Sequence, residues 1–240
     1  LCKYFKIMKV VASISQGLEK EGASELLELG AESVKASRRH ILFEADMSCL
    51  YRLHLQARLP FRFLREIARF YCDGPDNLYS GIQQSIDWKN WLNPSKSFRI
   101  DVTGFGSGLS HSHFTALKVK NAIIDLQRRI WGNRSSINLH KPDVCFHLHL
   151  ANNEAVLSVD GSASSLHKRG YKPAIGIAPI KENLAAGLMR MTEWDGTINL
   201  VDPLCGSGTF LIEAVSNLLG ISYAKDKQFL FENWPDFDIF

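Results

Sequence analysis

The sequence of 240 residues lacks any long apolar run. A membrane-spanning helix needs roughly 18 to 20 consecutive apolar residues. No stretch approaches that length, and Lys9 interrupts the early apolar segment "KIMKVVASI". A transmembrane helix and a secretory signal are therefore not expected, and we interpret the protein as cytoplasmic.

Paired cysteines are absent as well. The five cysteines are odd in number, far apart and never in a CxxC pair: Cys2, Cys49, Cys72, Cys145 and Cys205. This pattern fits neither a disulfide framework nor a zinc knuckle, and it is typical of a reducing compartment. The pair His147 and His149 would share one face of a strand, but no further ligand is spaced to join them, so we expect no metal.

The sequence also lacks a large net charge. The net charge is +3 with a pI near 8.6, which permits a nucleic-acid partner without requiring one. Internal repeats and low-complexity segments are not found. With 45% hydrophobic and 22% charged residues, the composition is that of a globular chain with one large domain or two to three small ones.

Residues 1–72 show a β-α-β-β-α-β pattern. Strand-like segments are "KVVASIS", "SVKAS", "HILFEA" and "RFLREIARFY", and amphipathic helices are expected over "GLEKEGASELLEL" and "MSCLYRLHLQA". This order predicts a ferredoxin-like domain. Its last strand carries several arginines, which we interpret as strand residues and not as an RNA-binding stripe. Turn residues in "CDGPDN" mark its boundary.

Residues 73–162 predict a second domain that also mixes helices and strands. One helix is expected over "LYSGIQQSIDWKNWL", then a strand in "SFRIDVTGF" and a long amphipathic helix over 110–131 with Ser110 or Ser112 as its cap. Two alternating strands, "VCFHLHL" and "EAVLSVD", are joined by the hairpin turn "ANN".

Residues 163–240 begin with a linker rich in small and basic residues. A helix is expected over 178–191, followed by an apolar strand, "TINLV", that ends at Asp202. A loop with Gly206 and Gly208 follows, and then a second helix. The apolar segments "TINLV" and "QFLFENW" are expected to be exposed edges. The fold class is therefore α/β, with an α+β front half and the beginning of a Rossmann-like domain.

The glycine loop has the layout of a cofactor site, because a strand end, a loop and a helix start favour an anionic group. A dinucleotide fingerprint needs a third glycine where Leu211 stands, and a P-loop needs a lysine where Thr209 stands. What remains is an acidic acceptor, Asp202, before Gly-x-Gly. This arrangement suits the amino-acid end of S-adenosylmethionine; an ordinary strand-to-helix turn is the alternative.

Several segments resemble one known family. "DPLCGSGTFLIEA" and "HKRGYKPAIGIAPIKENLAAGL" are similar to the first part of the catalytic domain of bacterial 23S ribosomal RNA guanine-N2 methyltransferases. "LYSGIQQSIDW" and "SGLSHSHFTALKVKNAIIDLQRR" are similar to the modules that precede it, which include a THUMP domain. The resemblance implies a ferredoxin-like domain at 1–72, a THUMP RNA-binding domain at 73–162, and a linker with an incomplete methyltransferase domain at 163–240.

The resemblance also implies which residues hold S-adenosylmethionine. The loop around its methionine part would be Asp202, Gly206, Ser207, Gly208 and Thr209. A second segment, "APIKEN", would close the other side with Pro179, Lys181, Glu182 and Asn183. Cys205 has no histidine near it in sequence, and we interpret it as a small loop residue.

In that family an Asn/Asp-Pro-Pro-Tyr/Phe motif grips the exocyclic amine of the target base. This sequence has no Pro-Pro pair among its eight prolines, and it begins with Leu1 instead of methionine. We therefore expect the N-terminal portion of such an enzyme, inactive by itself. Two alternatives stay open: a transfer RNA guanine-N2 methyltransferase with a THUMP domain, and a non-catalytic RNA-binding module with a vestigial loop.

RNA contacts are expected from basic side chains, since phosphate contacts supply most non-specific affinity. The candidates lie on the long helix and in the linker: Lys118, Lys120, Arg128, Arg129, Lys168 and Arg169. Lys and Arg on an amphipathic helix are equally typical of a solvated face, so for each of these residues both interpretations stay open.

Overall fold

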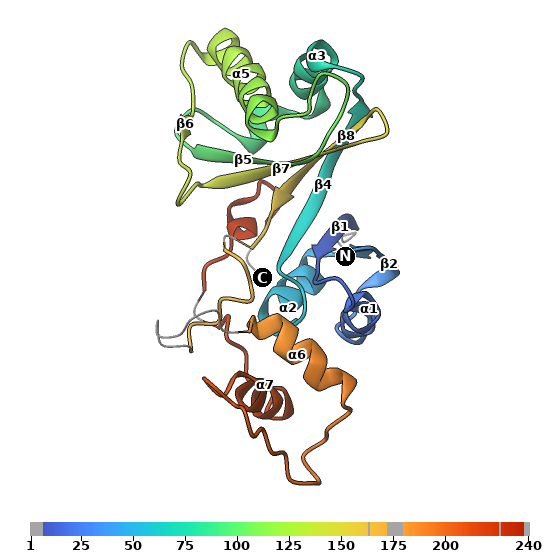
Figure 1. Ribbon diagram of the computed structural model, residues 1–240. Coiled ribbons are helices and arrows are strands. Elements are labelled where there is room, and N and C mark those ends of the chain that lie inside the picture. The colour runs from blue at the N-terminus through green and yellow to red at the C-terminus, as the bar shows by residue number, and fades with distance from the viewer. Residues whose placement is uncertain (1–6, 163, 172–179, 226, 238–240) are drawn as a thin grey trace. The chain divides into compact units, whose positions relative to one another are not determined.

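The computed structural model describes residues 7–162, 164–171, 180–225 and 227–237, and these form two compact units (Figure 1). The first unit combines Leu1–Phe63 with Ser164–Lys227. The second combines Leu64–Ala163 with Gln228–Phe240. Each unit is thus built from two separate stretches of the chain.

The front of the first unit has the predicted β-α-β-β-α-β order. Its elements are β1 (Met8–Ser13), α1 (Glu19–Glu28), β2 (Glu32–Ser37), β3 (His40–Ala45), α2 (Met47–Gln56) and the start of β4 (Arg62–Tyr71). β3 pairs antiparallel with both β1 and β2, with Val10 opposite Phe43. Alternating side chains of β1 and β3 are buried, as are Leu50 and Leu53 of α2, and α2 contacts β3.

The described part of the first unit also contains the helices α6 (Glu182–Met191) and α7 (Thr209–Leu218). They pack against each other, and α6 also contacts α1. α6 starts at Glu182, later than expected from the sequence, and Pro179, which was proposed to hold the cofactor, lies outside the described residues. α7 begins directly after Gly208, as expected.

The strand expected over "TINLV" is not formed, so that prediction was wrong. A strand is held by main-chain hydrogen bonds to a neighbour, and the described part of the first unit places no strand beside residues 197–201. The apolar side chains there are open to solvent: Ile198 is 71% exposed and Val201 is 78% exposed. The apolar pattern alone was not sufficient to make a strand.

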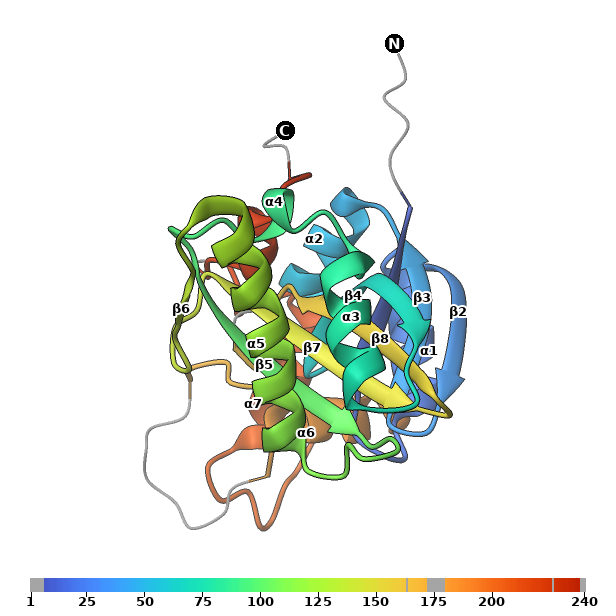
Figure 2. The same cartoon turned by 90° about the horizontal axis from the view of Figure 1, so that it is seen from above.

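The second unit is a mixed sheet with helices on one face (Figure 2). Its strands follow the order β4-β8-β7-β5-β6, and α3 and α5 lie over β5, β7 and β8. The elements are α3 (Pro75–Ser85), α4 (Trp88–Trp91), β5 (Ser97–Gly104), α5 (Ser112–Trp131), β6 (Ser136–Ile137), β7 (Val144–Ala151), β8 (Glu154–Asp160) and the 3-10 helix η1 (Leu230–Asn233).

Local details of the second unit differ from the sequence prediction. The single helix expected over "LYSGIQQSIDWKNWL" is split, because Ile86 is extended and the Asp87 side chain caps α4 by accepting a bond from Lys89 N. Neither Ser110 nor Ser112 caps α5; His111 is at the N-cap, and its side chain makes no capping bond. The hairpin turn is confirmed, with positive φ at Asn152 and Asn153.

The segment around η1 is part of the core of the second unit. Phe229, Phe231 and Trp234 are each at most 5% exposed, and Phe231 N donates to Gly161 O. The expectation that "QFLFENW" forms an exposed edge was therefore wrong. The reason is tertiary: the segment returns to the sheet of the second unit and packs its aromatic side chains there.

Candidate cofactor loop and its anchor

The loop from Asp202 to Thr209 makes a tight turn into α7. Gly206 and Gly208 have φ of +51° and +72°, in the left-handed region that glycine enters at little cost. Gly208 N donates to Cys205 O at 2.7 Å, and Ile212 N donates to Gly208 O at 2.9 Å. A Cβ at Gly206 would meet no atom within 4 Å, so the main chain is open to an approaching ligand at that point.

Asp202 presents an acceptor that nothing in the described part of the chain uses. Its Oδ1 accepts a bond from Leu204 N at 3.1 Å, whereas Oδ2 is buried and has no partner there. Buried acceptors in proteins nearly always bind a donor. An ammonium group would fit Oδ2, and the first free N–H groups of α7 would suit a carboxylate. The residues present thus fit the two charged ends of an amino acid.

The remaining loop residues lie where the sequence placed them. The hydroxyls of Ser207 and Thr209 are 3.1 Å apart, and Thr209 is buried at the first turn of α7. Cys205 is an exposed free thiol beside the glycines. The assignment of these residues to a cofactor stays a prediction.

The other residues proposed to hold the cofactor lie at the start of α6, apart from Pro179. Lys181 is at the N-cap of α6, and its Nζ lies 5.3 Å from the centre of the Phe61 ring. Glu182 is buried, and Asn183 is fully buried with its Nδ2 donating to Leu59 O at 3.0 Å. Asn183 Oδ1 is buried and has no hydrogen-bond partner in the described residues. For Lys181, Glu182 and Asn183 the cofactor assignment stays a prediction.

A buried carboxylate that sequence reasoning missed lies at the middle of α7. Glu213 Oε2 is 2.9 Å from Arg169 Nη1 and 3.4 Å from Arg58 Nη1, and Glu213 Oε1 accepts from the Tyr171 hydroxyl at 2.6 Å. Burial raises the pKa of the Glu213 carboxyl, while the two guanidinium groups act in the opposite direction. No local sequence signal marks this cluster, because its members come from three separate segments.

Arg169 was proposed to bind RNA, and the structure corrects this. Its side chain is only 5% exposed, it pairs with Glu213, and its Nη2 donates to Arg58 O at 2.7 Å. A guanidinium held in this way is not available to a phosphate. The neighbouring Lys168 is exposed, so its RNA contact stays a prediction.

The four cations of α5 keep their candidate role in RNA binding. Lys118 and Lys120 are half-buried, and Arg128 and Arg129 are exposed in the last turn. Arg128 lies 3.8 Å from Asp125, and Arg129 donates to Gln83. Exposed pairs of this kind are weak, so both arginines could exchange their partners for phosphates.

His147 and His149 both contact one hydroxyl. Thr103 Oγ1 lies 3.2 Å from His147 Nε2 and 3.0 Å from His149 Nδ1. Among the described residues, no group of three or more His, Cys, Asp or Glu side chains is arranged to hold a metal ion. Over the same residues, no helix is long and apolar enough to cross a membrane.

Comparison with known families matches the chain in three consecutive parts. Residues 9–64 match the RlmL ferredoxin-like domain, residues 76–160 the THUMP domain, and residues 169–233 the RMKL-like methyltransferase domain. The chain thus carries regions similar to a ferredoxin-like domain, a THUMP domain and a methyltransferase domain, in this order. The predicted fold class and family resemblance are therefore confirmed.

Individual relatives match nearly the whole chain. A putative RNA methyltransferase of Synechocystis sp. is 45% identical over 228 residues, covering 95% of this chain and 59% of the relative. The ribosomal RNA large subunit methyltransferase K/L of Ectopseudomonas mendocina is 39% identical over 231 residues, covering 94% of this chain. The chain spans about 32% of the K/L relative.

The solved structure of SMU.472, a putative methyltransferase complexed with SAH, has the same fold. It superposes with a TM-score of 0.82 at 28% identity, covering 97% of this chain and 61% of that one. The structural similarity thus extends over nearly the whole chain.

Proposed function

We propose that this chain is the part of a ribosomal RNA methyltransferase that binds RNA and admits the cofactor S-adenosylmethionine. The observation that carries the proposal is the loop at Asp202, where a buried acceptor without a partner in the described residues stands before the free N–H groups of α7. The K/L relatives and the SAH complex of a structural neighbour support it.

In this proposal each loop residue has a defined task. Asp202 Oδ2 would accept hydrogen bonds from the ammonium group, and main-chain N–H groups of the loop and of the first turn of α7, other than that of Gly208, would donate to the carboxylate. When bound, S-adenosylmethionine supplies a methyl group on a sulfonium centre. Cys205 takes no part in the proposed reaction, because methyl transfer to an amine needs no covalent enzyme intermediate.

The proposed acceptor is the exocyclic N2 of guanine in 23S ribosomal RNA. This amine is a poor nucleophile because its lone pair is delocalised into the ring. The base must therefore be held out of its stack and aligned with the methyl group. The Pro-Pro motif that performs this task in the family is absent from the 240 residues, so we expect no catalysis by this chain alone.

We also propose that the domains span residues 1–72, 73–162 and 163–240, and that the protein is located in the cytoplasm, where 23S ribosomal RNA is accessible.

Two other functions are compatible with the family. A transfer RNA target keeps the chemistry and changes only the substrate, because THUMP domains occur in tRNA-modifying enzymes. A non-catalytic RNA-binding module would retain the loop without using it.

Ligand-detected NMR with S-adenosylhomocysteine tests the cofactor site. We expect weak binding that Asp202→Asn abolishes, while Asp195→Asn, a substitution of an exposed aspartate seven residues earlier, leaves it intact. Absence of binding to the unmodified chain would favour the vestigial module. Tight binding would show that a nearly complete cofactor site is already present.

RNA competition separates the substrate alternatives. We expect 23S ribosomal RNA fragments to displace a labelled 23S probe more effectively than transfer RNA or DNA of equal length. Preferential displacement by transfer RNA would select the alternative substrate. Detectable methyl transfer by residues 1–240 alone would contradict the expectation that this chain is inactive.

A further inference from the structure

The helix that carries the candidate cofactor loop is held at two points by one arginine of the ferredoxin-like part. Arg58 Nη1 contacts Glu213 Oε2 at 3.4 Å near the middle of α7. Its Nη2 donates to Ser216 O at 2.7 Å and to Ile221 O at 2.6 Å, at the C-terminal end of the helix and just beyond. One guanidinium thus fixes both the rotation of α7 and its position along the axis.

Arg58 is itself held rigidly by the main chain around it. Arg58 N and Leu59 N donate to the two carboxylate oxygens of Glu25, at 2.8 and 3.0 Å, and Glu25 is buried on α1. The carbonyl of Arg58 accepts from Arg169. A side chain on such a fixed base loses little freedom when it binds a helix, so it can define the position of that helix.

Glu213 connects the contact with Arg58 to the position of the cofactor loop. It stands four residues after Thr209 in the same helix, so the two side chains lie on one face about one turn apart. Thr209 begins the turn whose N–H groups face the proposed carboxylate. The free N–H groups point along the helix axis, so a rotation of α7 that separated Glu213 from Arg58 would move them around that axis and out of line with their ligand.

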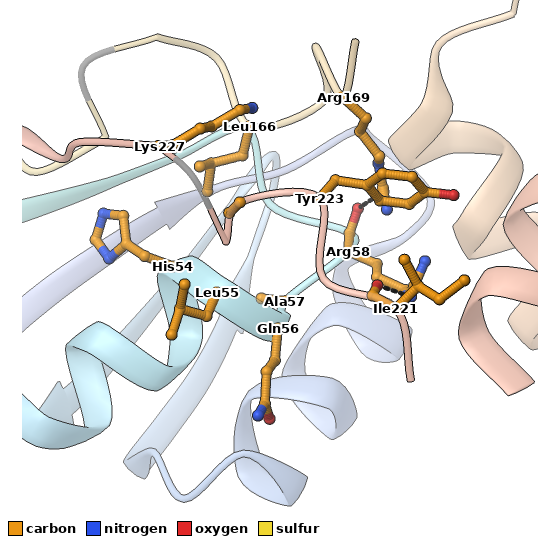
Figure 3. Close-up of a pocket in the computed structure, with 11 residues that line it drawn as sticks. His54, Leu55, Gln56, Ala57, Arg58, Leu166, Arg169, Ile221, Tyr223 and Lys227 are labelled. Atoms are coloured by element: carbon orange, nitrogen blue, oxygen red, sulfur yellow. Dashed lines mark hydrogen bonds between the residues drawn. The ribbon is translucent and has the colours of Figure 1, made fainter. Parts of the chain in front are cut away.

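On the side that faces His54 and Lys227, the cluster of Arg58, Arg169, Glu213 and Tyr223 leaves no room for a substrate. The guanidinium groups of Arg58 and Arg169 lie 5.8 and 5.4 Å from the Tyr223 ring centre (Figure 3). The cavity beside them, lined also by His54 and Lys227, has a volume of about 20 Å³. That volume admits one water molecule and no larger ligand.

We propose that Arg58 is a positioning residue for the cofactor loop, acting through Glu213 to set the orientation of the first turn of α7. The proposal rests on the function proposed above only for the identity of the ligand. It assigns the ferredoxin-like part a second task besides any contact with RNA: it places the cofactor-binding helix.

Hydrogen exchange in the 240-residue chain tests the positioning directly. The amides of Gly208 and Ile212 are both hydrogen-bonded and report on the loop and the first turn of α7. In Arg58→Met we expect their protection to fall about tenfold or more, while Val10 and Phe43, paired in the neighbouring strands, change less than about threefold. A uniform loss throughout the first unit would show a merely structural role and overturn the proposal.

Two further variants sharpen the result. Arg65→Met removes an equally buried, ion-paired arginine of the second unit, and it should leave Gly208 and Ile212 protected. Arg58→Lys keeps a charge opposite Glu213 but cannot replace all three guanidinium contacts, so we expect an intermediate loss. If Arg58→Met does not fold, Arg58→Lys decides: unchanged protection of Gly208 and Ile212 would contradict the proposal.

The same variants test the positioning role of Arg58 independently of the proposed binding of the cofactor. S-adenosylhomocysteine binding, followed by NMR, should weaken in Arg58→Met and remain in Arg65→Met. If the unmodified chain binds no S-adenosylhomocysteine, the cofactor assignment fails, but the exchange result still decides whether Arg58 positions the loop. If it binds and Arg58→Met binds equally well, the positioning role fails while the cofactor assignment stands.

Discussion

The Arg65 guanidinium forms two parallel hydrogen bonds to the Asp236 carboxylate, at 2.7 and 2.6 Å, across 171 residues of sequence. The same guanidinium lies 5.4 Å from the Trp91 ring centre and 5.2 Å from that of Trp234. Bidentate pairing and two neighbouring aromatic rings, whose centres lie 6.2 Å apart, make this a well-defined ionic contact of the second unit. It ties the segment after η1 to β4.

The first prediction concerns this contact. Asp236→Asn leaves a buried guanidinium without its counter-charge. We expect the free energy of unfolding to fall by about 1 to 3 kcal/mol, which is less than for a fully buried pair because the Asp236 side chain is 34% exposed. Urea unfolding followed by tryptophan fluorescence measures it. Asp101→Asn, at a more exposed pair with Arg99, is the control and should cost under about 1 kcal/mol. Equal decreases would contradict the special role of Asp236.

The second prediction compares two glycines with similar backbone angles. Gly104, with φ of +75°, ends β5, and a Cβ there would lie 2.0 Å from Leu150 O on the neighbouring strand. Gly132, with φ of +67°, ends α5, and a Cβ there would meet nothing within 4 Å. We expect Gly104→Ala to cost about 2 to 4 kcal/mol and Gly132→Ala about 1 kcal/mol. Urea unfolding of both variants checks the difference; similar costs would mean that β5 and β7 can separate freely.

The third prediction is a pH dependence set by His54. Burial lowers the pKa of this imidazole from 6.5 to about 3, and its Nδ1 lies 2.8 Å from Leu50 O. Because the folded-state pKa is depressed, the unfolded state binds the proton first as the pH falls. The protein should therefore lose stability between pH 6.5 and pH 3, by roughly 2 kcal/mol between pH 7 and pH 5.

His54→Gln isolates this contribution, since glutamine can still donate to Leu50 O but does not titrate in this range. We expect the difference in unfolding free energy between the two proteins to shrink as the pH falls from 7 to 5. Urea unfolding at each pH measures it. Parallel curves would indicate that His54 titrates normally in the folded state.

The fourth prediction concerns the RNA-facing cations of α5. We expect the double variant Arg128→Gln/Arg129→Gln to bind RNA more weakly and with less dependence on salt. The slope of log binding constant against log salt concentration should decrease in magnitude by about 0.7 to 0.9 for each phosphate that the variant no longer neutralises. The charge-matched control is Lys20→Gln with Lys35→Gln, two exposed lysines of the first unit. Filter binding at several salt concentrations gives the slopes. The same change in both double variants would indicate a general effect of charge instead of a surface on α5.

Some features of the fold could be read directly from the residues. The alternation in "VCFHLHL" predicted β7, and Asn152 and Asn153 predicted the turn that follows it, because strand period and turn geometry are local properties. The loop at Gly206 and Gly208 was also found in sequence, since positive φ there favours glycine.

Other features depended on distant segments. The apolar run "TINLV" resembles a strand, yet it needs a neighbour to pair with, and Val201 is exposed instead. Arg169 resembled an RNA contact until its pairing with Glu213 was visible. Arg58 and Glu213 are separated by 155 residues, so no window of sequence could show that they meet.

The sequence by itself determined the order of most helices and strands, the resemblance to known methyltransferases, and the residues of the candidate cofactor loop, because these follow from periodicity, turn chemistry and motif. Only the tertiary structure decided which charged side chains are solvated and which are buried in pairs. The physical reason is that a charge is retained inside a protein only where a partner compensates its lost hydration, and for Arg58, Arg65 and Arg169 that partner lies far away in the chain.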